Sequence, residues 1–119
     1  KEQKLYNDLL KYYNDIYVIN YRKLPYVDDE ALKKLQSSIK LNISLLKDDY
    51  PDLCNYAQNL VDSINTYRVW ATAYGIMKIN KTDNDSNKKY NQICNKVNDA
   101  TEEIFNSFSI YSQEHRKNF

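Results

Sequence analysis

The chain has 119 residues with a 42% hydrophobic fraction, and its 17 Lys and Arg residues nearly balance 16 Asp and Glu residues, for a formal net charge of +1. This length fits one domain with a core of its own, and the charge balance argues against a dedicated nucleic-acid-binding protein, which usually shows a basic excess or a basic stripe. No apolar run approaches the roughly 20 residues of a membrane-spanning helix, and no signal-peptide pattern is present.

Two helical segments are predicted in the first half of the chain, separated by Pro25. Apolar residues recur there at steps of three and four, the spacing of one face of an α-helix. This pattern predicts helices over about residues 3–24 and 28–49, the second with Asp28 as its N-cap. The residues expected in the core are Leu5, Leu9, Tyr12, Ile16 and Ile19, followed by Leu32, Leu35, Ile39, Ile43 and Leu46.

The second half has the cleanest helical register. Pro51 suits the first position of a helix, where its missing N–H is not needed, and the apolar period predicts a helix over residues 51–80. The polar run TDNDSN ends this helix, and a last helix is predicted over 87–114 with Ser86 as its N-cap. The expected core faces are Leu53, Ala57, Leu60, Ile64, Tyr67, Ala71 and Tyr74, then Tyr90, Ile93, Val97, Ala100, Ile104, Phe108 and Tyr111.

No segment shows the sustained alternation typical of a β-strand. Four helical segments joined by short polar connections therefore predict an all-α fold. The expected architecture is an antiparallel up-down-up-down four-helix bundle, in a single domain over residues 1–119.

The two cysteines test this register. In such a bundle, Cys54 at the start of the third helix lies roughly 30 Å along the hairpin from Cys94, at 1.5 Å per residue, whereas a disulfide needs Cα atoms within about 7 Å. We therefore expect free thiols, which favour a reducing compartment. Because the sequence begins at Lys1 and not at Met, a trimmed N-terminus also leaves an exported or surface location open.

Motifs for catalysis, metal or cofactor binding are missing from the sequence. The run DNDSN begins like a calcium loop, but the sixth and twelfth positions, which should be Gly and Glu, are Lys88 and Cys94. No Glu-x-x-His pair is present for a metal site in a bundle, and one Gly cannot build a phosphate loop. We expect no metal, no cofactor and no enzymatic activity.

The stretch RVWATAYG holds the chain's only Trp and only Gly. Gly75 costs about 1 kcal/mol relative to Ala inside a helix, so we interpret it, with Ala73, as a position where a neighbouring helix packs closely. The alternative is a pocket for a small apolar ligand near Trp70, Met77 and Tyr90, as in a ligand-binding or sensory bundle.

The first helix is apolar beyond its core stripe. Tyr6, Leu10, Tyr13, Tyr17 and Tyr21 lie beside that stripe at about 100° per residue, and together the two lines cover an arc of roughly 200°, wider than a core-facing stripe needs to be. Tyrosine is enriched at interfaces, which favours a partner-binding or self-association surface at Tyr6, Tyr13, Tyr17 and Tyr21.

Two considerations keep an alternative open for this tyrosine face. The arc would also be accounted for if it packs on both adjacent helices with its hydroxyls reaching solvent. Abundant Asn, Lys, Ile and Tyr are also typical of an AT-rich genome, which makes the 12 tyrosines weak evidence by number alone. The sequence thus favours a non-enzymatic protein-binding or structural module, with the small-ligand domain as the alternative.

Overall fold

The computed structural model describes the backbone of residues 2–22, 29–80 and 84–119, and their side chains except those of residues 17–22, 29, 32, 78–80 and 84–87. The helices are α1 (Glu2–Arg22), α2 (Asp29–Leu46), α3 (Pro51–Asn80) and α4 (Asn84–Asn118). No strand occurs in these described residues, so the predicted all-α class is confirmed.

The helix ends differ from the sequence pattern in two places. The second helix ends at Leu46 and not near residue 49, because the chain turns there and the Tyr50 N–H donates to the Leu46 carbonyl at 2.8 Å. The last helix begins at Asn84, so Ser86 lies inside it and the N-cap prediction was wrong. Asn84 and Asp85 suit a first turn, where polar and acidic side chains are favourable. Asp28, the other expected N-cap, lies outside the described residues.

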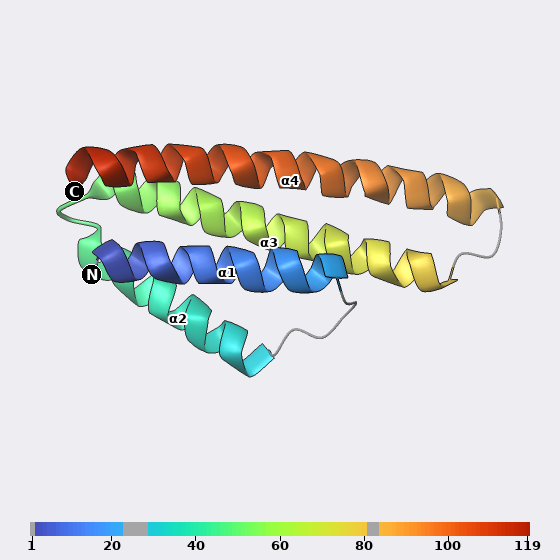
Figure 1. Ribbon diagram of the computed structural model, residues 1–119, viewed down its shortest axis with the longest axis horizontal. Helices are drawn as coiled ribbons and strands as arrows, with labels where there is room; N and C mark the ends of the chain where they lie inside the picture. Colours follow the sequence, from blue (N-terminus) through green and yellow to red (C-terminus); the bar gives the residue numbers. More distant parts are fainter. Residues whose placement is uncertain (1, 23–28, 81–83) are drawn as a thin grey trace.

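The four helices form an elongated molecule, with α3 and α4 side by side along its length and both termini at one end (Figure 1). Its principal extents are 54 × 27 × 19 Å. The first helix packs on α2 and α3, and α2 diverges from the others with distance from its connection to α3 (Figure 1).

One continuous hydrophobic core joins all four helices. Its buried members are Leu5, Leu9, Tyr12, Ile16, Leu35, Ile39, Leu46, Leu53, Cys54, Ala57, Leu60, Ile64, Tyr67, Ala71, Ala100, Ile104 and Tyr111. Most of the predicted core positions with described side chains are among them. Ile43, Tyr74, Tyr90, Ile93, Val97 and Phe108 are only half-buried. Several of these lie at the far end of α3 and α4, which are 30 and 35 residues long and extend past the helical residues of the 21-residue α1.

The cysteines are free, as the predicted bundle requires. Cys54 is buried, with its Sγ donating to the Ile43 carbonyl at 3.4 Å, and Cys94 is half-buried. Gly75 is buried within α3 and Ala73 is half-buried. Close packing of a neighbouring helix at these two residues stays a prediction.

Candidate functional site

The tyrosines of α1 pack against aromatic side chains of α4. The Tyr6 ring lies edge-on to Phe108 at 6.0 Å between centroids and is stacked on Tyr111 at 6.1 Å. Tyr13 contacts Phe108 as well, at 6.3 Å. Both tyrosines are half-buried, so this part of the predicted surface forms the seam between two helices. Tyr17 and Tyr21 lie outside the described side chains.

An apolar groove runs beside this seam, between α1 and α4. It has a volume of about 240 Å³ and is lined by Leu10, Tyr13, Ile104, Phe105, Phe108 and Ser109. No charged residue lines it. Two of its lining residues, Leu10 and Phe105, have 37% and 56% of their surface exposed. We name these six residues the α1–α4 groove.

The α4 side of this groove is what the sequence analysis missed. Phe105 lies beside the core stripe of α4, directly after Ile104 and about one turn before Phe108. This widening of the apolar arc matches the one on α1 and was the available signal. The sequence of a single helix does not reveal which neighbouring helix faces its apolar stripe. That the apolar faces of α1 and α4 together form one groove can therefore be known only from the fold.

The aromatic contacts continue from the groove to the end of the molecule that holds both termini. The Tyr6 ring lies 5.0 Å from the His115 ring, His115 lies 5.3 Å from Phe119, and Phe119 lies 4.9 Å from Tyr50. These contacts explain why α4 extends to Asn118, beyond the predicted end at residue 114. An aromatic cluster at this end therefore joins α1, the end of α4 and the turn before α3.

Buried polar atoms in this cluster lack partners. The Tyr111 hydroxyl, the Ser112 hydroxyl and His115 Nε2 have no hydrogen-bond partner among the described residues. Burial, with smaller contributions from Cys54 and Tyr6, raises the pKa of the Tyr111 phenol above its ordinary value. The phenol therefore stays protonated at neutral pH. The Tyr111 ring is surrounded by packed side chains where α1 meets α4.

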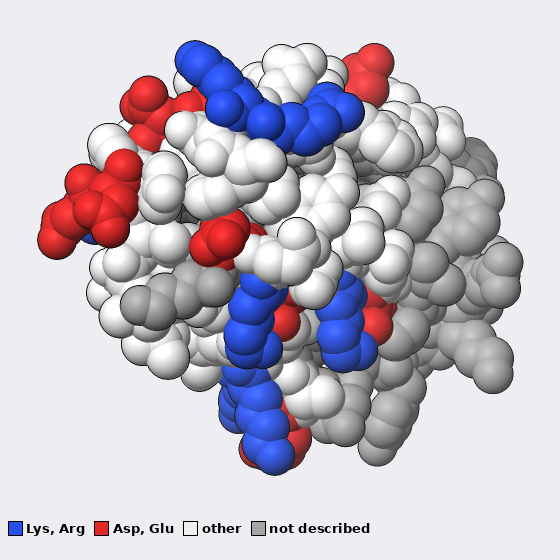
Figure 2. Space-filling view, turned by 60° about the vertical axis from the view of Figure 1, so that its left-hand side comes forward, with Lys and Arg blue, Asp and Glu red and all other residues white. Residues whose placement is uncertain are grey.

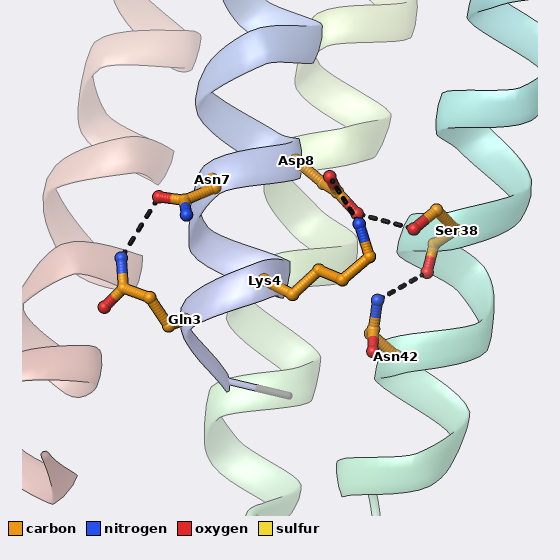
Figure 3. A network of polar contacts seen from close by, with 6 residues as sticks. All are labelled: Gln3, Lys4, Asn7, Asp8, Ser38 and Asn42. Atoms are coloured by element: carbon orange, nitrogen blue, oxygen red, sulfur yellow. Dashed lines mark hydrogen bonds and ion pairs between the residues drawn. The ribbon is translucent and has the colours of Figure 1, made fainter.

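Polar contacts hold α2 against α1 on the opposite side of the first helix. Asp8 is buried between Lys4 and Ser38 (Figure 3). The Lys4 Nζ lies 3.5 Å from the Asp8 Oδ1, and the Ser38 hydroxyl donates to the Asp8 Oδ2 at 2.6 Å. The Asn42 amide donates to the Ser38 carbonyl at 2.9 Å (Figure 3). Since a buried carboxylate is costly unless paired, this network fixes where α2 attaches.

The residues proposed for a small apolar ligand have other neighbours. Trp70 is half-buried with Lys96 Nζ 5.9 Å from its ring centroid, a cation–π distance. Tyr90 packs on Tyr74 with ring centroids 5.3 Å apart and donates a 3.1 Å hydrogen bond to its hydroxyl. That hydrogen bond is the main reason why the pKa of Tyr90 rises to about 12. Met77 is half-buried on the same end of α3. Trp70, Met77 and Tyr90 do not line the α1–α4 groove.

Charges and metal ligands are dispersed. Lys and Arg residues alternate with Asp, Glu and uncharged surface on the face seen in Figure 2. Within the described part of the chain, no group of three or more His, Cys, Asp or Glu side chains is placed to hold a metal ion. In the described part of the chain, no helix is long and apolar enough to span a membrane.

Comparison of the chain with protein-family models, with curated proteins and with solved structures finds no match.

Proposed function

We propose that this chain is a non-enzymatic protein-binding module and that its contact surface is the α1–α4 groove. One observation carries the proposal: a groove without charged lining residues whose rim exposes Leu10 and Phe105. Exposed apolar side chains gathered beside an apolar groove are a feature of protein interaction sites.

The shape and composition of the groove favour a protein partner. The cores of protein interfaces are rich in Phe and Tyr and poor in charge, as this groove is. A volume of about 240 Å³ suits one or two apolar side chains of a partner helix or loop, the mode in which an amphipathic helix lies in a groove. Tyr6 and Tyr13 support the surface from beneath through their contacts with α4.

The proposal includes the antiparallel up-down-up-down arrangement of the four helices. Three contacts between the third and fourth helical regions support it. Residues later in the third region contact residues earlier in the fourth, as antiparallel helices require. Tyr50 contacts Phe119, Ser63 lies 3.0 Å from Ser107 between hydroxyl oxygens, and Tyr74 contacts Tyr90. The short connection before Pro51 fits this arrangement as well.

Photo-crosslinking tests the binding surface. A photoreactive phenylalanine replaces Phe105 in one variant and Ile110, which is 47% exposed on the same helix outside the groove, in the matched control. We expect irradiation in an extract of the source organism, or of the purified chain alone, to give one defined protein adduct from position 105 and none from position 110. Equal labelling from both positions, or no adduct from position 105, would contradict the proposal.

A further inference from the structure

A second groove is lined by residues of α2 and α3. Its first part has a volume of about 230 Å³ and is lined by Gln36, Ile39, Lys40, Ile43, Gln58, Val61 and Asn65. Its second part, of about 520 Å³, is lined by Gln36, Asn65, Arg68, Val69 and Thr72. The two parts share Gln36 and Asn65, so they form one groove along α3, which we name the α2–α3 groove.

The two shared amides are held in place by a buried phenol. Tyr12 has no exposed surface, and its hydroxyl accepts a 2.6 Å hydrogen bond from Gln36 Nε2 and donates a 2.5 Å hydrogen bond to Asn65 Oδ1. Because Asn65 accepts with its oxygen, its amide nitrogen is left as a donor at the groove wall. The hydrogen bond from Tyr12 thus fixes the orientation of the Asn65 amide and leaves the Asn65 nitrogen able to donate to another group.

The charged residues that line the groove are both positive. They are Lys40, which is exposed, and Arg68, which is half-buried. Arg68 lines the same part of the groove as Gln36 and Asn65, and its positive charge opposes the rise in the pKa of Tyr12 that burial causes. Asp62, the acidic residue next to Val61, is engaged by the Gln58 amide at 3.0 Å and does not line this groove.

Polar and apolar side chains line both parts of the groove. Val61, Asn65 and Arg68 follow one another at helical spacing along one face of α3. In the first part Ile39, Ile43 and Val61 lie with polar residues, and in the second part Arg68 lies with Val69. Asn65 and Arg68 thus offer hydrogen-bond donors and positive charge beside apolar surface.

We propose that the α2–α3 groove binds a carboxylate attached to an apolar group. The carboxylate accepts hydrogen bonds from Arg68 and the Asn65 amide, and the apolar group covers Ile39, Ile43 and Val61. Charge-assisted hydrogen bonds from a guanidinium suit a carboxylate well. The same chemistry is offered by a free amphipathic acid and by an acidic side chain beside leucines in a peptide. This site is separate from the α1–α4 groove.

Titration with octanoate tests the site, followed by NMR of the side-chain amides of Gln36 and Asn65. We expect octanoate to shift both amide signals, and octanol, which has the same chain without the charge, to bind about tenfold or more weakly. A short peptide with one glutamate flanked by leucines forms the second arm. Tighter binding of octanoate would identify a small acid as the ligand type, and tighter binding of the peptide would identify a peptide.

Two variants and one control make the result specific. Arg68→Gln should weaken octanoate binding about tenfold or more, and Lys40→Glu, at an exposed position that tolerates substitution, should weaken it as well. Lys47→Gln, at an exposed lysine of the turn after α2, should leave it unchanged. Unshifted Gln36 and Asn65 amides with both probes, or octanoate binding unaffected by Arg68→Gln and Lys40→Glu, would overturn the proposal.

Discussion

Tyr12 in α1 donates a 2.5 Å hydrogen bond to Asn65 in α3 and thereby ties two helices together through a side chain with no exposed surface. The same hydroxyl accepts from Gln36 in α2. We predict that Tyr12→Phe lowers the free energy of unfolding by about 0.5–1.5 kcal/mol, because the hydrogen bonds from Tyr12 to Asn65 and from Gln36 to Tyr12 are lost while water can reach both amides at the groove wall. Urea unfolding measures this loss. Tyr56→Phe, at a half-buried tyrosine of α3, is the control and should change stability less.

Tyr111 gives the opposite expectation for the same chemical change. Its ring is fully buried but its hydroxyl has no hydrogen-bond partner among the described residues. Removing an unsatisfied hydroxyl in Tyr111→Phe should leave the free energy of unfolding unchanged or raise it by about 1 kcal/mol. A loss of stability as large as that of Tyr12→Phe would show that the Tyr111 hydroxyl is paired.

The stability of the protein should fall in alkaline solution. Burial raises the pKa of Tyr12 and Tyr111 above the value of about 10 for an unfolded chain. As pH rises past about 10, the unfolded chain loses these protons before the folded chain does, so their contribution to stability is complete below that pH and is lost above it. Urea unfolding at increasing pH tests this, and Tyr111→Phe should reduce the slope. A slope unchanged by that substitution would count against burial as the cause.

Gly75 should resist replacement by alanine. Alanine is the better helix former by about 1 kcal/mol, yet Gly75 is buried in α3 and an added methyl group there costs about 1–3 kcal/mol through overpacking. We therefore predict a lower melting temperature for Gly75→Ala. Thr72→Ala, at an exposed position one turn earlier, is the control and should be neutral or stabilising. A stabilised Gly75→Ala protein would remove the close-packing interpretation.

The two free thiols should differ in reactivity. Cys54 is buried, and burial raises the pKa of its thiol, whereas Cys94 is half-buried. Since the thiolate is the reactive form, a thiol reagent should modify Cys94 first and Cys54 only as the bundle opens. Reaction in urea, where both thiols are accessible, provides the reference rates. Faster reaction of Cys54 in the folded protein would contradict its place in the core.

The helices and most of the core could be predicted from the apolar period, because α3 and α4 repeat it over many turns. The role of Tyr6 and Tyr13 could not, since a tyrosine face fits both a helix seam and a protein interface. The choice depends on how α1 and α4 are placed relative to each other, which no local pattern encodes. Phe105 was missed for the same reason. The Tyr12 bridge was also beyond prediction, because its three members lie on three helices.

The most direct test of the protein-binding proposal is the affinity of Phe105→Ala for the partner captured at position 105, measured with its melting temperature. We predict binding weakened by about tenfold or more and a melting temperature close to that of the unmodified chain, because Phe105 is 56% exposed. Ile110→Ala should retain full affinity. Unchanged affinity of Phe105→Ala, or an equal loss in Ile110→Ala, would contradict the α1–α4 groove as the binding surface.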